Sequence, residues 1–215
     1  MNQRGSRIPS LTGIAAVALW VVGLVVSDGL SDSLADNASD QQVLAWVQGN
    51  TDYILSGGWL FMLGSLVFLA FAGILHGRMA EAGASGSAPT IAFGGAVAGA
   101  VFGLAIPAGD VALAINKDNV SASSAGALHT LGDAFFVGAE LAAVAFLVAT
   151  AIVILRTAAL PRLLAYFGIL VAVVLVIGPV GWAGLIFGLP VWTLWASIAL
   201  ARRPRIALAG DVVTA

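Results

Sequence analysis

The sequence predicts an all-α protein, a polytopic transmembrane bundle of six helices. Of its 215 residues, 60% are hydrophobic and only 9% are charged. Soluble domains carry about 25% charged residues, so this chain has too few charges to cover a water-exposed surface. Its hydrophobicity also excludes intrinsic disorder, which requires low hydrophobicity and high net charge. Long charge-free stretches then mark the membrane spans, because a charged side chain is costly in hydrocarbon.

The charge-free stretches place the spans in order along the chain. They are expected at residues 11–27, 54–75, 90–115, 131–155, 163–178 and 183–201. Charged or titratable residues bound the first two, since Arg7 and Asp28 flank one and Asp52 and His76 flank the other. Pro89 favours a helix start at the third span, because proline suits the first helical turn.

The last two spans are predicted as a hairpin. Arg162 and Arg202 enclose 39 uncharged residues, which as one helix would extend about 58 Å, roughly twice the hydrocarbon thickness. Glycine and proline at residues 178–181 indicate the turn. Residues 188–190 offer a competing turn, so the boundary between these two helices stays open.

The distribution of arginine predicts the orientation. With a cytoplasmic N-terminus, the inner segments carry eight arginines and the outer segments carry only Lys117, which is a strong positive-inside bias. We therefore expect one domain over residues 1–205, a short cytoplasmic tail over 206–215, both termini in the cytoplasm and a bacterial inner membrane as the location. The eight are Arg4, Arg7, Arg78, Arg156, Arg162, Arg202, Arg203 and Arg205.

The first outer loop contains a short predicted helix. Ser39 and Gln42 have the spacing of a capping box. Val43, Leu44 and Val47 are then expected to face the membrane surface, with Trp46 at the level of the headgroups. Four aspartates of this loop recur every four residues, and we expect a solvated irregular loop, with a cation-attracting rim as the alternative. They are Asp28, Asp32, Asp36 and Asp40.

Small residues form one face of the third helix. Gly95, Gly99 and Gly103 recur every four residues, and such a face lets another helix backbone approach closely. We favour packing within the bundle. The alternative is a structural or accessory subunit that uses this face to bind a second copy or another membrane protein.

The fourth helix carries the most informative polar residues. His129, Asp133 and Glu140 lie on one helical face, and Glu140 falls near the bilayer midplane. Asp110 on the third helix, beyond a kink expected at Pro107, lies at the level of Asp133. Such carboxylates in a membrane are functional candidates by default. We therefore expect an acidic path for a proton, an ion or a small solute, with a hydrogen-bonded, protonated Glu140 of purely structural role as the alternative.

Other classes of function have weaker support. His129, Asp133 and Asp110 are ligand types for zinc or manganese, and a metal-dependent enzyme is the least favoured alternative. Haem ligation by His76 and His129 is excluded because they belong to opposite membrane surfaces. A net charge of −2 argues against nucleic-acid binding, and the lack of cysteine removes thiolate sites. We expect no cofactor and a lipid bilayer as the surroundings, and we favour a non-enzymatic role while leaving enzymatic activity open.

Two segments resemble a known group of proteins. Residues 160–168, Leu-Pro-Arg-Leu-Leu-Ala-Tyr-Phe-Gly, precede an apolar hairpin and Arg202-Arg203-Pro204, and Leu128-His129-x-x-Gly132-Asp133 opens the fourth helix. This arrangement resembles uncharacterised bacterial six-helix integral membrane proteins of high-GC bacteria, of the domain-of-unknown-function type. The resemblance implies the topology and no activity.

Overall fold

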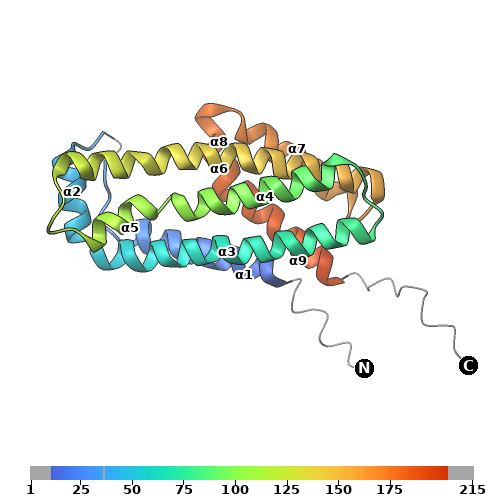
Figure 1. Cartoon of the computed structure of the whole chain (residues 1–215), viewed down its shortest axis with the longest axis horizontal. Helices are drawn as coiled ribbons and strands as arrows, with labels where there is room; N and C mark the ends of the chain where they lie inside the picture. Colours follow the sequence, from blue (N-terminus) through green and yellow to red (C-terminus); the bar gives the residue numbers. More distant parts are fainter. Residues whose placement is uncertain (1–10, 36, 203–215) are drawn as a thin grey trace, which may run out of the picture.

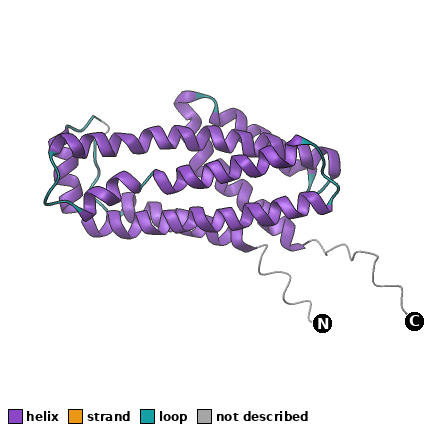
Figure 2. Cartoon of the chain, in the orientation of Figure 1, coloured by secondary structure: helices purple, strands orange, loops and turns teal. Residues whose placement is uncertain are grey.

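The structure, a computed structural model, describes residues 11–35 and 37–202. Within these residues it contains helices, turns and loops but no β-strand (Figure 2). Several parts of the sequence-based prediction lie outside the described residues: Arg4, Arg7, Asp36, Arg203, Arg205 and the tail over 206–215.

The helices follow one another with short connections. Their bounds are α1 Thr12–Leu24 with a π-helical turn η3 Val25–Gly29, α2 Asp40–Gly49, α3 Thr51–Glu81, α4 Ser87–Ala105, α5 Ala108–Ile115, α6 Ala122–Thr157, α7 Arg162–Leu175, a 3₁₀ turn η4 Gly178–Val180, α8 Gly181–Ala183, a π-helical turn η5 Gly184–Gly188 and α9 Leu189–Arg202. The capping box expected at Ser39 and Gln42 opens α2, where the Ser39 backbone N–H donates to Gln42 Oε1 at 2.8 Å.

Five helical stretches in the described part of the chain are long and apolar enough to cross a membrane. They are Thr12–Gly29, Thr51–Glu81, Ser87–Ile115, Ala122–Thr157 and Gly178–Arg202. The remaining apolar helix, Arg162–Leu175, has 14 residues and a length of about 21 Å. It ends early because glycine and proline follow at residues 178–181, where the chain turns. Residues 188–190, the competing turn, are helical.

The bundle is elongated (Figure 1), and different charged residues lie toward its two ends. The helix ends that carry Arg78, Arg156, Arg162 and Arg202 lie toward one end, which we call the arginine end. The opposite end, where α2 lies across the bundle and α5 is found, is called the aspartate end after Asp28, Asp40 and Asp110.

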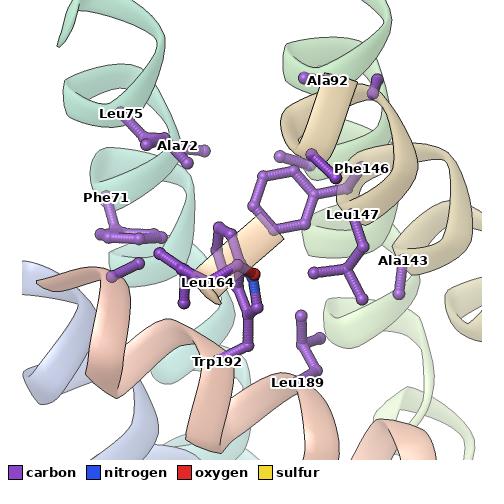
Figure 3. Packing of buried hydrophobic residues seen from close by; sticks show 14 of the residues in the cluster. Phe71, Ala72, Leu75, Ala92, Ala143, Phe146, Leu147, Leu164, Leu189 and Trp192 are labelled. Carbon is purple, nitrogen blue, oxygen red and sulfur yellow. The ribbon is translucent and has the colours of Figure 1, made fainter. Parts of the chain in front are cut away.

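An aromatic and aliphatic core fills the bundle between α3, α6, α7 and α9 (Figure 3). Trp192 is only 1% exposed, and its ring packs edge-on against Phe146 with centroids 5.2 Å apart. Its indole N–H donates to the backbone carbonyl of Leu164 at 3.1 Å, which satisfies the buried polar atom. Trp192 is therefore a packing residue and not an anchor at the membrane interface.

The small-residue face of α4 lies inside the bundle. A Cβ atom on Gly95 would stand 2.7 Å from the Phe146 backbone nitrogen on α6. A Cβ on Gly103 would stand 2.5 Å from Ser65 Oγ on α3, while Gly99 has more room. The glycines thus let α4 approach α3 and α6 of the same chain.

The prediction that α2 lays Val43 and Val47 on the membrane surface is wrong. Both side chains are buried, at 4% and 0% exposure, against residues of α3, α5 and α6. The apolar face of α2 is instead covered by the bundle, because α2 folds back across the aspartate end (Figure 1).

Candidate functional site

The candidate site begins with an Asp–His pair between α5 and α6. Asp110 Oδ1 lies 2.9 Å from His129 Nδ1. Proline has no backbone N–H and breaks the helix, so Pro107 ends α4, starts α5 and places Asp110 in its first turn. Gly109 lets the two helices meet, because a Cβ there would collide with the carbonyl oxygen of Leu128.

The helix α6 begins at Ala122, well before residue 131, where the fourth span was expected to start. Ser121 caps it by accepting a hydrogen bond from the Ser124 backbone N–H at 3.2 Å. This earlier start places His129 within a regular helix, two turns from its end. The imidazole is therefore held by a continuous helix and not by a loop.

Trp46 of α2 covers the imidazole. The two rings meet edge-on with centroids 5.8 Å apart, and the indole N–H donates to the Asp32 carbonyl at 2.7 Å. The side-chain oxygen of Asn50 accepts from the Asp32 backbone N–H at 3.0 Å, which fixes the loop before α2. Trp46 therefore closes over the site, and its expected position at the level of the headgroups stays a prediction.

A cavity of about 170 Å³ lies beside the Asp–His pair. The carboxylates of Asp28, Asp110 and Asp133 line it together with His129, and none of its lining residues, all in the described part of the chain, is lysine or arginine. Even a protonated His129 leaves the carboxylates in excess, so the cavity attracts positive charge. The remaining lining residues are Leu24, Ser27, Trp46, Ile54, Gly58, Phe61, Ile106, Pro107, Gly132 and Phe136.

A second cavity of about 250 Å³ adjoins the first. Apart from Asp28 and Ser65, its lining is apolar or glycine. Ser65 is already engaged, since it accepts from the Trp20 indole N–H at 3.1 Å and donates to the Phe61 carbonyl at 3.2 Å. The two cavities share Leu24, Asp28, Phe61, Ile106 and Phe136.

Three interruptions of helical geometry border these cavities. The π-helical turn η3 supplies Asp28, the α4–α5 break supplies Ile106, and the π-helical turn η5 supplies Leu185 and Ile186. Such π-helical turns occur frequently at functional sites, because they redirect side chains and free backbone groups. Three irregular segments of this bundle thus lie beside the cavities.

Glu140 lies elsewhere on α6. Its carboxylate packs against Gly181 of α8, where a Cβ would stand 2.7 Å from Glu140 Oε1. It lines neither cavity, and it is displaced from Asp133 by about 10 Å along the helix axis. Of the three acidic residues singled out in the sequence, the structure brings Asp110 and Asp133 to one cavity and places Glu140 outside it.

Metal-ion chemistry finds no support in the described residues. They contain no group of three or more histidine or carboxylate side chains arranged to hold an ion. His129 and Asp110 meet, but Asp133 does not complete a ligand set with them. Metal ligation by these three residues therefore stays a prediction without structural support.

Sequence reasoning missed several residues of the site. The sequence places Asp28 in the first outer loop, whereas the structure has it in the π-helical turn η3, where it lines the cavity. Phe61 and Phe136 carried no signal, because one aromatic in an apolar helix has no distinguishing pattern.

Comparisons with protein-family models, with curated proteins and with solved structures found no match for this chain. The resemblance to six-helix bacterial membrane proteins stays a prediction, and the geometry of the cavities is the remaining guide to function.

Proposed function

We propose that this chain is a multi-pass membrane protein that binds a small cation or cationic solute in the acidic cavity and handles its passage. The observation that carries the proposal is the excess of carboxylates over positive charge in one cavity at the aspartate end. A carboxylate in a membrane protein without a positive partner is costly, and one that faces a cavity serves a pathway or a ligand.

The proposed orientation places the arginine end in the cytoplasm of a bacterial cell and the aspartate end outside. The four described arginines support it, since cytoplasmic loops are enriched in this residue. The acidic cavity then faces the outer surface, where it takes up a cation.

Each polar residue has a distinct role in the proposal. Asp110 orients the imidazole of His129 through their 2.9 Å contact. Asp133, whose side chain is exposed, and Asp28, which lines both cavities, attract the cation. Glu140 is a candidate for a later binding step of the cation along α6, and Glu140→Gln tests this role.

A flux assay tests this proposal. We expect the reconstituted protein to increase cation or proton flux across liposomes, and Asp110→Asn to remove most of that increase. Asp118→Asn is the matched control, because it makes the same change at a residue that lines neither cavity. Flux through the wild type equal to that of empty liposomes contradicts a transport role.

Two further variants locate the path. Loss of flux in Asp133→Asn supports the acidic cavity as its entrance. Loss of flux in Glu140→Gln with normal flux in both cavity variants moves the path to the α6–α8 contact and overturns the assignment of the cavity.

A further inference from the structure

We propose that the two adjoining cavities form one binding site for a lipophilic organic monocation, with the charged group in the acidic cavity and the apolar group in the second cavity. This inference rests on the proposed function and names the class of its ligand. It is carried by the continuity of the two cavities and the sharp change of chemistry between them.

The continuity follows from the shared walls. Phe61 of α3 and Phe136 of α6 line both cavities, as do Leu24, Ile106 and Asp28. A ligand that lies across these residues therefore contacts carboxylates at one end and hydrocarbon side chains at the other. A small inorganic ion would leave the larger, apolar cavity unused.

The acidic cavity selects the charge of the ligand. Its carboxylates repel anionic amphiphiles, and a zwitterionic phospholipid would bring a phosphate beside Asp28, Asp110 and Asp133. Trp46, Phe61 and Phe136 add aromatic faces and edges around the same space. Carboxylates combined with aromatic rings favour weakly hydrated cations such as quaternary ammonium groups.

The second cavity selects the apolar part. Its walls include Trp20, Phe68 and Phe146, which also form the aromatic cluster of the core. An apolar chain held there packs against these side chains, a contact that a small cation cannot make. Val21, one of its lining residues, is 49% exposed on the outer surface of α1, so the cavity borders the surface that faces lipid.

Gly99 offers a way to fill the second cavity without disturbing the helices. It lines this cavity, and a Cβ there would meet only Ala142 Cβ at 3.9 Å, an ordinary contact. Gly94 on the same helix has no atom within 4 Å of a Cβ and does not line the cavity. Gly99→Leu and Gly94→Leu therefore compare the same change inside and outside the proposed site.

The test measures saturable binding to the full chain in phosphatidylcholine nanodiscs, with empty nanodiscs subtracted. The probes are dodecyltrimethylammonium, tetramethylammonium and dodecyl sulfate. We expect dodecyltrimethylammonium to bind at least tenfold more tightly than tetramethylammonium and to compete with it, and dodecyl sulfate not to compete. We expect Gly99→Leu to weaken dodecyltrimethylammonium binding at least tenfold without changing tetramethylammonium binding, and Gly94→Leu to change neither.

The outcomes separate this inference from the proposed function. Tetramethylammonium binding that depends on Asp110, with no gain from the dodecyl chain, overturns the inference and leaves the proposed function standing. Competition by dodecyl sulfate as strong as that by dodecyltrimethylammonium overturns both. Gly99→Ala keeps the comparison available where Gly99→Leu fails to fold, because a Cβ at this position makes only an ordinary contact.

Discussion

Replacing Gly95 by alanine introduces a methyl group into the contact between α4 and α6. The new Cβ would stand 2.7 Å from the Phe146 backbone nitrogen and 3.0 Å from the Ala142 carbonyl oxygen, whereas ordinary contact begins at 3.4 Å. Both atoms belong to the backbone and cannot rotate away, so the two helices must separate by several tenths of an ångström. Overpacking of this kind costs about 1–3 kcal/mol.

Gly94→Ala isolates this cost. A Cβ at Gly94 meets nothing within 4 Å, and both substitutions gain the same helix propensity, about 1 kcal/mol for glycine to alanine. The propensity gain cancels in the difference between the two variants. We therefore expect Gly95→Ala to have a free energy of unfolding about 1–3 kcal/mol lower than that of Gly94→Ala.

Unfolding in mixed micelles of dodecyl maltoside and sodium dodecyl sulfate, followed by circular dichroism, measures this difference. Equal free energies of unfolding for the two variants would show that α4 and α6 do not approach at Gly95. A Gly95→Ala variant more stable than Gly94→Ala would show that the small-residue face lies outside the bundle.

Two further predictions concern the core and the helix caps. Trp192→Phe keeps an aromatic ring but leaves the buried Leu164 carbonyl without its indole donor, so the free energy of unfolding should fall by about 1–3 kcal/mol. Trp182→Phe, at a residue that is 51% exposed, should change the free energy of unfolding little. Equal losses in the two variants would contradict the buried hydrogen bond. Ser39→Ala should destabilise α2 by about 1 kcal/mol and speed amide hydrogen exchange there, and unchanged exchange would contradict the cap.

Much of the fold follows from the cost of placing charges in hydrocarbon. Charge-free stretches indicate the long helices because polar flanking residues are costly to place in hydrocarbon. Arg7, Asp28, Asp52 and His76 are therefore expected in the headgroup region or in water. The helix ends are harder to predict, since an amphipathic segment such as the start of α6 continues the helix beyond the apolar stretch. The short helix α7 lies in a charge-free stretch like those of the longer helices, so the absence of charge does not reveal its shorter length.

The candidate site was only partly predictable. The spacing of Asp133 and Glu140 places both on one face of α6. Asp133 lines the acidic cavity, whereas Glu140, two turns farther along the helix, packs against Gly181 of α8. The contact between Asp110 and His129 requires the break at Pro107 and the close approach at Gly109, which are tertiary features. The contact between Trp46 and His129 joins residues remote in sequence, so no local pattern indicates it.

The length of α6 has a consequence for how a ligand meets the protein. With its 36 residues the helix is about 54 Å long, far more than the roughly 30 Å depth of the acyl-chain layer. In the proposed orientation Arg156 marks the inner edge of that layer, and the opposite edge falls about 20 residues earlier, near Phe136. The wall shared by the two cavities then coincides with the boundary between lipid tails and headgroups. An amphiphilic cation adsorbed on the outer leaflet would already have its head and tail at the matching depths, and it could enter sideways without turning over.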